Sequence, residues 1–290
     1  MKIVIIGGGI GGLSSALFLS RLGASVVVYE AFSRPDASSQ SQAIGMMLAT
    51  NGLNALATYS KAMADELHTT GYPSPHVEIR EPRGTILGLT PAGARGRHGP
   101  YGTIVCTRWD MIRILLEECG RVGVTLEYDS PLESLEETSD GVRVKLGQGV
   151  EVKADLVVGA DGMRSRVRAH LLGDKNVEPE FQGLTNISGL VKRSEVPSIC
   201  SQLFSAPGPT VTEGRGGILT FGKVGAFGIA PIDNKTAAEG GRLMWWSNFE
   251  YGEQHRDGEV REKLEHMDVI SLLKTRHGDW SVILVTRLST

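Results

Sequence analysis

The sequence predicts an α/β fold in which a parallel β-α-β sheet carries an inserted, mostly antiparallel sheet. Residues 2–6 form a short apolar run that ends in glycines, as strands buried on both faces do. Residues 13–22 follow with helical spacing, and residues 25–29 are a second, β-branched run. Short apolar segments alternate with glycine and proline turns over residues 181–249, which favours antiparallel strands.

The segment after the first β-α-β unit is predicted to leave that unit and return to it later. Residues 32–42 are rich in Ser, Pro and Asp and are predicted to be a loop. Asn51 is predicted to cap one helix that continues through Met63. Residues 71–102, rich in Gly, Pro and Arg, are predicted to form an excursion with short strands such as residues 77–79.

Helices and strands then alternate again. Residues 103–106 and 124–128 are predicted strands on either side of a helix over residues 109–119. Residues 142–153 are predicted to form a half-exposed hairpin, and residues 156–158 a buried strand.

The remaining elements are a charged turn, the inserted sheet and a late helix. The acidic run over residues 133–140 is predicted to be a solvated turn. Residues 259–273 are predicted to be a helix. The strands predicted in the inserted sheet include residues 187–191, 217–221, 227–229 and 243–246.

Composition excludes several classes of protein. Of 290 residues, 41% are hydrophobic and 22% charged, which is typical of a soluble globular chain. The net charge is -3 with no basic block, so no nucleic-acid partner is expected. No apolar stretch approaches the about 18 residues of a transmembrane segment. The three cysteines, which lack metal-ligand spacing, favour reduced thiols in the cytoplasm.

The first motif that carries chemistry lies between the first strand and the first helix. Gly7, Gly9 and Gly12 form G-x-G-x-x-G in the context that dinucleotide binding requires, and Gly11 lies in the same turn. Such glycines permit the turn, the approach of a pyrophosphate and close helix packing, while the helix N-terminus attracts phosphate. Glu30 ends the second strand, where a carboxylate accepts hydrogen bonds from a ribose diol. NAD and FAD share this fingerprint, so both remain open here.

The second motif distinguishes between them. Residues 159–168 follow a buried strand and have the sequence GADGMRSRVR, which includes Asp161 and Gly162 and ends at Arg168. This segment resembles the Asp-Gly motif, G-A-D-G-x-x-S-x-V-R, of the para-hydroxybenzoate hydroxylase-like FAD monooxygenases. In that family the segment contacts FAD and lies near where NAD(P)H approaches.

Smaller likenesses extend the resemblance over nearly the whole chain. Arg108, between a strand and a helix, matches an arginine that reaches the flavin side in the family. Gly45 belongs to a segment that resembles the one passing the flavin ring. Residues 244–248 resemble a strand of the substrate domain, where the tryptophans belong either to a pocket wall or to the core.

The resemblance implies a Rossmann-like FAD-binding domain with an inserted, mostly antiparallel β substrate domain. The FAD-binding domain comprises residues 1–75 and 99–180, and the substrate-binding domain comprises residues 76–98 and 181–275. The implied activity is a monooxygenation that consumes O2 and either NADPH or NADH. A flavin C4a-hydroperoxide would hydroxylate or epoxidise a small aromatic or polyketide-like substrate. No residue is identified as catalytic, no metal site is predicted, and the sequence does not indicate an oligomeric state.

A third family motif, a Gly-Asp after a strand, is expected beyond residue 280 and is not found. Gly278 and Asp279 do not replace it, because no buried strand precedes them. A C-terminally truncated, catalytically impaired flavoprotein or a non-redox interaction protein is therefore the alternative expectation. An NAD-dependent dehydrogenase is a weaker alternative, since no catalytic His, Lys or Tyr has the required context. A cyclase or isomerase of the same fold is indistinguishable from sequence.

Overall fold

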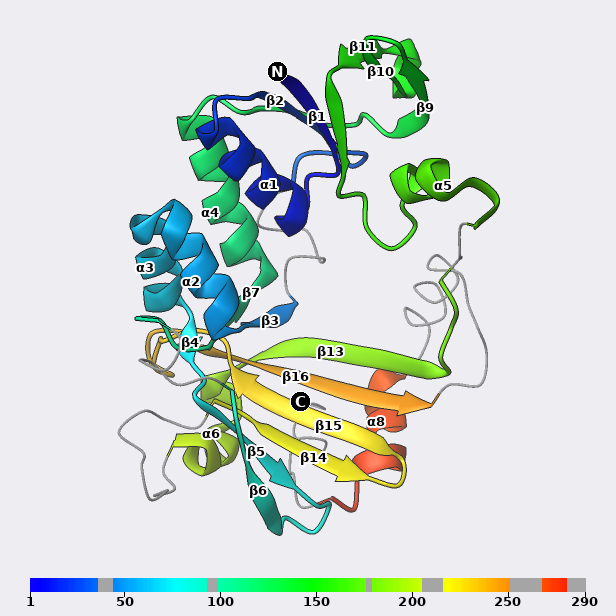
Figure 1. Ribbon diagram of the computed structural model, residues 1–290. Helices are drawn as coiled ribbons and strands as arrows, with labels where there is room; N and C mark the ends of the chain where they lie inside the picture. Colours follow the sequence, from blue (N-terminus) through cyan, green and yellow to red (C-terminus); the bar gives the residue numbers. More distant parts are fainter. Residues whose placement is uncertain (36–43, 93–98, 176–178, 205–215, 251–267, 281–290) are drawn as a thin grey trace. The chain divides into compact units, whose positions relative to one another are not determined.

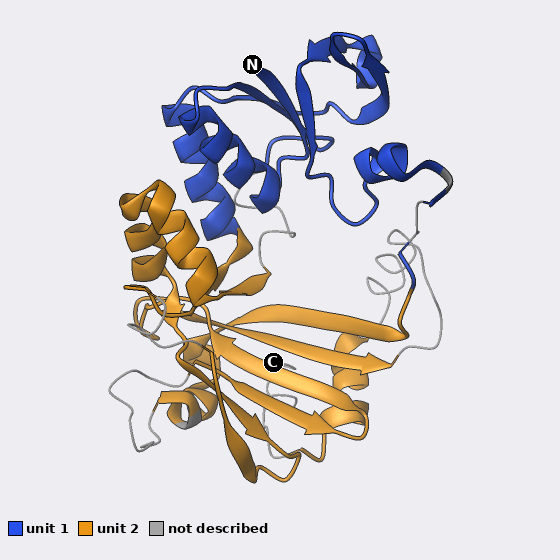
Figure 2. Cartoon of the chain, in the orientation of Figure 1, with its two compact units in different colours: residues 1–42, 109–180 blue, residues 43–108, 181–290 orange. Residues whose placement is uncertain are grey.

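The computed structural model describes residues 1–35, 44–92, 99–175, 179–204, 216–250 and 268–280. The chain divides into two compact units (Figure 2). Unit 1 comprises residues 1–42 and 109–180, and unit 2 comprises residues 43–108 and 181–290. Each unit is therefore assembled from two separate stretches of chain.

Unit 1 is built on a four-stranded parallel sheet (Figure 1). Its strands lie in the order β12 (Leu156–Gly159), β1 (Lys2–Ile6), β2 (Ser25–Tyr29) and β8 (Thr125–Glu127). The side chains of Ile3, Val4 and Ile5 are completely buried, as expected for a central parallel strand. Helix α1 (Ile10–Arg21) connects β1 to β2, which confirms the predicted β-α-β unit.

Helix α4 (Arg108–Arg121) leads from unit 2 into unit 1 and packs against α1 there. The Cys119 thiol donates to the carbonyl of Leu13 at 3.9 Å, and burial raises the pKa of this thiol to about 12. Cys119 is therefore a packing residue with a protonated, unreactive thiol.

A second, antiparallel sheet in unit 1 corrects one prediction. It consists of β9 (Leu132–Thr138), β10 (Gly141–Leu146) and β11 (Glu151–Ala154). The predicted hairpin is confirmed, but the acidic run is strand β9 rather than a turn. Leu132 pairs with Leu146 and contributes to the core, while the carboxylates lie on the solvent side, where Glu136 pairs with Arg143 at 2.7 Å.

Unit 2 is built on a six-stranded sheet. Its order is β13 (Leu184–Lys192), β16 (Arg242–Glu250), β15 (Gly225–Pro231), β14 (Ile218–Gly222), β5 (His76–Arg80) and β6 (Ile86–Pro91). All neighbouring strands are antiparallel except β14 and β5. The mostly antiparallel sheet predicted from residues 181–249 is confirmed, and the excursion contributes β5 and β6 at one end of the strand order.

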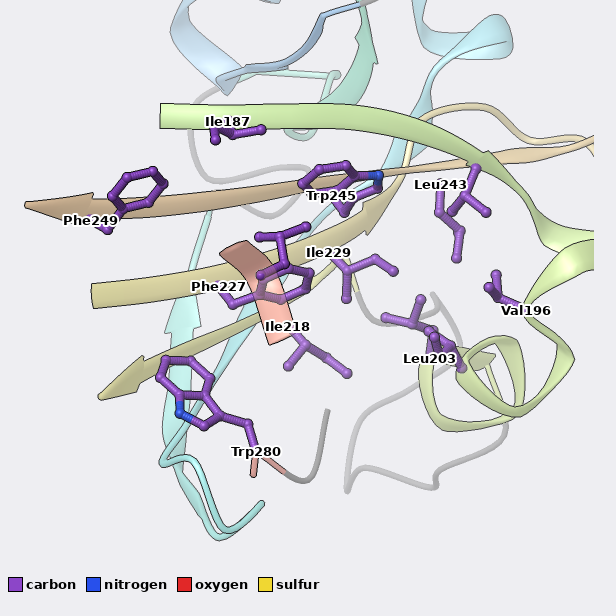
Figure 3. Packing of buried hydrophobic residues seen from close by; sticks show 13 residues of the cluster. Ile187, Val196, Leu203, Ile218, Phe227, Ile229, Leu243, Trp245, Phe249 and Trp280 are labelled. Atoms are coloured by element: carbon purple, nitrogen blue, oxygen red, sulfur yellow. The ribbon is translucent and has the colours of Figure 1, made fainter. Parts of the chain in front are cut away.

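One face of this sheet forms a large apolar core in unit 2. Helices α6 (Pro197–Phe204) and α8 (Val269–His277) pack against side chains such as Phe227, Trp245 and Phe249 (Figure 3). The helix predicted over residues 259–273 falls partly outside the described residues, and α8 begins where the Asp268 side chain accepts from the Ser271 N–H at 3.0 Å.

A small antiparallel sheet and two helices complete unit 2. The sheet has the order β3 (Gly45–Leu48), β7 (Ile104–Thr107) and β4 (Tyr72–Pro73). The single helix predicted from Asn51 is instead two, α2 (Thr50–Tyr59) and α3 (Lys61–Thr70). Ser60 separates them because its backbone is extended and its hydroxyl accepts from the Met63 N–H at 3.4 Å as the cap of α3.

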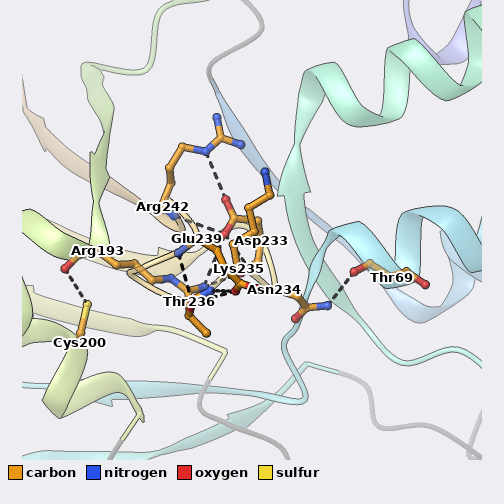
Figure 4. A network of polar contacts seen from close by, with 9 residues as sticks. All are labelled: Thr69, Arg193, Cys200, Asp233, Asn234, Lys235, Thr236, Glu239 and Arg242. Carbon is orange, nitrogen blue, oxygen red and sulfur yellow. Dashed lines mark hydrogen bonds and ion pairs between the residues drawn. The ribbon is translucent and has the colours of Figure 1, made fainter.

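A buried polar network joins the ends of β13 and β16 (Figure 4). One Asp233 carboxylate oxygen lies 3.8 Å from Arg193 Nη2, and the other lies 3.2 Å from Arg242 Nε. The Arg193 guanidinium also lies over the Phe204 ring, 4.7 Å from its centroid. Because each buried charge has partners, this network stabilises the loop between β15 and β16.

No helix in the described part of the chain combines the length and apolarity needed to cross a membrane. Within the same residues, no cluster of three or more His, Cys, Asp or Glu side chains has the arrangement of a metal site.

Candidate functional site

The two glycine motifs lie side by side in unit 1. Strands β1 and β12 are parallel neighbours, with Ile6 opposite Gly159, so the motifs follow the carboxyl ends of adjacent strands. The Ala160 N–H donates to the Ile6 carbonyl at 2.7 Å, which extends the pairing into the second motif. Ligands of open α/β sheets bind at this edge.

Close backbone packing requires glycine at two positions of the first motif. Gly7 has a φ of +105°, and a Cβ there would lie 2.4 Å from the Ala160 carbonyl oxygen. A Cβ on Gly12 would lie 1.9 Å from the Gly7 carbonyl oxygen. Gly11 differs, since its Cβ would meet nothing within 4 Å. Gly7 and Gly12 therefore shape the turn, whereas Gly11 leaves open surface beside it.

The N-terminus of α1 is left available to an anion. Gly9 is the N-cap residue with an extended backbone, and no described side chain caps it. The first turn of α1 also carries no acidic residue. Free N–H groups and the positive end of the helix dipole favour phosphate at such a position. The turn and helix together fit the pyrophosphate of a dinucleotide.

Glu30 holds the neighbouring backbone. Its Oε2 accepts from the Gly8 N–H at 2.6 Å and its Oε1 accepts from the Phe32 N–H at 3.0 Å. Each carboxylate oxygen has a further lone pair that can accept from a ribose hydroxyl. The carboxylate predicted to bind ribose thus also fixes the glycine turn, a role that sequence analysis did not predict.

Asp161 caps the helix that follows the second motif, α5 (Arg166–Leu172). Its carboxylate accepts from the Ser165 hydroxyl at 2.6 Å and from the Arg166 and Val167 N–H groups at 2.7 and 3.2 Å. Gly162 has a φ of +80° and open space around its missing Cβ. Asp161 therefore orients α5 and leaves the backbone at Gly162 accessible.

Gly45 and Arg108, the other two predicted site residues, lie together in unit 2. Gly45 pairs with Thr107 across β3 and β7, and the Arg108 N–H donates to the Ile44 carbonyl at 2.9 Å. The Arg108 side chain is exposed. A Cβ on Gly45 would lie 2.1 Å from Met244 Sδ, so this glycine lets the six-stranded sheet approach β3.

The two tryptophans of β16 have different surroundings. Trp245 is only 8% exposed and stacks on Phe227 with the ring centroids 6.2 Å apart, which makes it a core residue. Trp246, the next residue, is half-buried on the opposite face. The sequence left open whether these tryptophans belong to a pocket wall or to the core. Trp245 belongs to the core, and Trp246 is the candidate for a pocket wall.

A groove of about 670 Å³ lies at the tip of the six-stranded sheet and was not predicted. Its lining residues come from β13, the β14–β15 hairpin, β16 and α8; they include Leu184, Phe221, Val224, Asn248 and Arg276. Because these residues come from four separate segments, no local sequence pattern reveals the groove.

Comparison with known proteins identifies a family. A family model described as an FAD binding domain matches residues 1–281. The 3-amino-4-hydroxybenzoate 2-monooxygenase PtmB3 of Streptomyces platensis is 33% identical over 211 residues, which cover 68% of this chain and 48% of that protein. The FAD-dependent urate hydroxylase of Klebsiella pneumoniae is 30% identical over 201 residues, covering 67% and 49%.

Solved structures share the fold. Klebsiella pneumoniae HpxO complexed with FAD and uric acid superposes with a TM-score of 0.72 at 22% identity, over 99% of this chain and 65% of that chain. The 2,6-dihydroxypyridine-3-hydroxylase from Arthrobacter nicotinovorans superposes with a TM-score of 0.67 at 24% identity, over 87% of this chain and 57% of that chain. The chain spans about half the length of the curated relatives that it matches.

Proposed function

Because the chain belongs to the FAD binding domain family, we propose that it is a flavin-dependent monooxygenase chain that binds FAD at the carboxyl ends of β1, β2 and β12. The observation that carries this proposal is the cradle formed where Gly7, Gly12 and Ala160 pack together. A side chain at either glycine would clash with this backbone and displace the turn. The backbone there fits a pyrophosphate at the α1 N-terminus.

The roles of the site residues follow from their positions. Gly7, Gly9, Gly11 and Gly12 present backbone to the pyrophosphate, and Glu30 accepts hydrogen bonds from the ribose hydroxyls. Asp161 orients α5 so that the Gly162 backbone lies beside the cofactor. For Gly45 and Arg108, a contact to the flavin side rests on the family resemblance alone.

The proposed reaction hydroxylates or epoxidises a small aromatic or polyketide-like substrate. Bound FAD would supply the redox chemistry, taking electrons from NADH or NADPH and reacting with O2. The substrates in the names of PtmB3 and the urate hydroxylase are both small and aromatic, which supports this class. Unit 2, with its antiparallel sheet, is the proposed substrate-binding unit.

The test is whether the purified 290-residue chain binds FAD and oxidises a nicotinamide cofactor. We expect saturable FAD uptake by absorbance and flavin bleaching on anaerobic addition of NADH or NADPH. Glu30→Gln should weaken FAD binding about 10-fold, because a charge-assisted acceptor is lost. The matched control is Glu127→Gln, at the end of the neighbouring strand β8, which should bind FAD normally.

The outcomes separate the alternatives. A chain that takes up no FAD contradicts the proposal. A chain that binds FAD but is not reduced by NADH or NADPH, with or without an aromatic compound, is a flavoprotein without monooxygenase activity. NAD binding in place of FAD would support the dehydrogenase alternative.

A further inference from the structure

The two faces of the six-stranded sheet differ in what covers them. On one face, Trp245 and its neighbours lie in the core beneath α6 and α8. On the other, which we call the open face, β16 presents Met244, Trp246 and Asn248, all half-buried. Val105 of β7 packs against this face near Met244. Trp246 packs against the same small apolar cluster as Met244 and is half-buried, so part of its side chain remains accessible.

Trp246 lies across the neighbouring strand on the open face. It pairs with Gly228 of β15, where a Cβ would lie 2.0 Å from the indole Cζ2 and 2.1 Å from Cε2. The indole therefore occupies the space above Gly228, which the missing side chain leaves free. A larger residue at position 228 would push the ring off the strand. Gly228 thus sets the position of the indole on the sheet.

Two amides lie farther along the same face. Asn186 of β13 is directly opposite Asn248 of β16, and its Nδ2 donates to Asn248 Oδ1. Within the described residues, this bond leaves Asn186 Oδ1 as an acceptor and Asn248 Nδ2 as a donor toward a ligand. The pair thus offers one acceptor and one donor to the edge of a molecule lying on Trp246.

The same face leads to the segment predicted to pass the flavin ring. Met244, two residues before Trp246, packs closely against Gly45 of that segment, where a side chain would clash with the Met244 sulfur. Residues two apart in a strand are separated by about 7 Å, roughly the width of one aromatic ring. At the other end, Asn248 lines the groove of about 670 Å³, so a ring substituent directed away from Gly45 has room.

We propose that Trp246 is the stacking platform for the aromatic ring of the substrate and that Asn186 and Asn248 recognise its polar edge. The substrate class is a planar aromatic compound whose edge carries both a hydrogen-bond donor and an acceptor, such as a phenol or a lactam. Offset stacking on an indole and a two-point amide contact favour such a ring over a saturated one. The inference rests on the proposed function, since it names the class of substrate that the proposed monooxygenase would take.

The experiment measures binding of three planar probes to the full chain by isothermal titration calorimetry, with and without FAD. The probes are 3-amino-4-hydroxybenzoate, urate and 2-quinolone, and cyclohexanecarboxylate is the saturated comparison. We expect saturable binding of at least one planar probe and none of the saturated acid. Trp246→Ala should weaken that binding about 10-fold, and Trp246→Phe should restore most of it.

Three further variants separate stacking from folding. Trp245→Phe changes the same residue type on the covered face and should leave probe affinity unchanged. Gly228→Ala keeps Trp246 but displaces its indole, so it should weaken binding as Trp246→Ala does. Asn248→Leu should weaken binding of the planar probes, because one half of the two-point amide contact is lost. Circular dichroism and thermal unfolding of each variant show whether it is folded.

The inference is overturned if no planar probe binds, or if Trp246→Ala binds them as the unchanged protein does. FAD absorbance on the same samples tests the proposed function separately. A chain that takes up FAD but shows no effect of Trp246→Ala refutes the platform alone. A chain without FAD uptake refutes the proposed function, and the titrations without FAD still decide the platform.

Discussion

Gly12 shows how strictly one residue can be determined by packing. A side chain at this position would clash with the Gly7 carbonyl oxygen, and the Ala160 side chain lies just beyond that oxygen. Gly11, its neighbour in the same helix turn, faces open space. The two adjacent glycines therefore differ in purpose, although the sequence presents them as one motif.

Alanine at these two positions should have opposite effects. Gly12→Ala forces backbone to move and should lower the free energy of unfolding by about 3 kcal/mol or more. Gly11→Ala should raise it by about 0.5–1 kcal/mol, because alanine is the better helix former and has room. Urea unfolding of the variants measures both. Equal destabilisation by the two changes would contradict the packing argument.

His277 is a second residue whose surroundings determine its chemistry. Its ring is 2% exposed, its Nε2 lies 2.8 Å from Ser247 Oγ, and its Nδ1 is buried without a hydrogen-bond partner among the described residues. Burial, assisted by the Arg276 charge and opposed by Asp279, lowers its pKa from 6.5 to about 4. The folded protein therefore holds this imidazole neutral.

This lowered pKa predicts acid sensitivity. Below pH 6.5 the unfolded chain takes up a proton at His277 that the folded chain refuses until about pH 4. The free energy of unfolding should therefore fall by up to about 3 kcal/mol as the pH drops through this window. His277→Gln, which can still bond Ser247, should lose that part of the pH dependence. Denaturant unfolding at pH 7.5 and pH 5 would show it, and an unchanged difference between the two would count against the prediction.

Among the elements, helix α5 depends on the residues that precede it. Asp161 and Ser165 share a hydrogen bond, and together they accept the N–H groups of Arg166, Val167 and Arg168. Seven residues are too few for a helix to be stable by itself. The second glycine motif therefore supplies the capping that holds α5 in place.

Removing either cap should cost about 1 kcal/mol of stability, and removing both should cost less than the sum. Thermal unfolding of Asp161→Ala, Ser165→Ala and the double variant measures the coupling. FAD affinity then separates two roles of Asp161. If the carboxylate acts only through α5, Asp161→Ala and Ser165→Ala weaken FAD binding equally; if it also touches the cofactor, Asp161→Ala weakens binding more.

Helices and strands were predicted correctly where apolar residues recur at a regular spacing, and incorrectly where charged residues mask that spacing. The β-α-β unit and the hairpin follow from period and glycine position, and the structure confirms both. In β9 the carboxylates concealed a strand whose inward residues are Leu132 and Leu135. The proximity of Gly45 to Arg108 depends on the pairing of β3 with β7, which the sequence of either strand alone does not show.

For the whole molecule, cofactor binding should be measurable as stability. A ligand that binds only the folded state stabilises it by about 2.7 kcal/mol at 100 times its Kd. FAD should therefore raise the unfolding midpoint of the chain, and Glu30→Gln should need more FAD for the same shift. NAD at equal concentration should leave the midpoint unchanged. A midpoint that rises with NAD and not with FAD would refute the cofactor assignment.

The central place of β1 in the parallel sheet has a consequence for the order in which the protein is made. β1 pairs with β2 after some 20 residues of further chain, but its other edge pairs with β12. That strand emerges from the ribosome only after 150 more residues, roughly 10–30 s later at ordinary rates of synthesis. Until then the Gly7 turn lacks the Ala160 carbonyl against which it packs. A nascent chain thus acquires its complete glycine cradle only after Ala160 has been translated, and cofactor uptake must follow that moment.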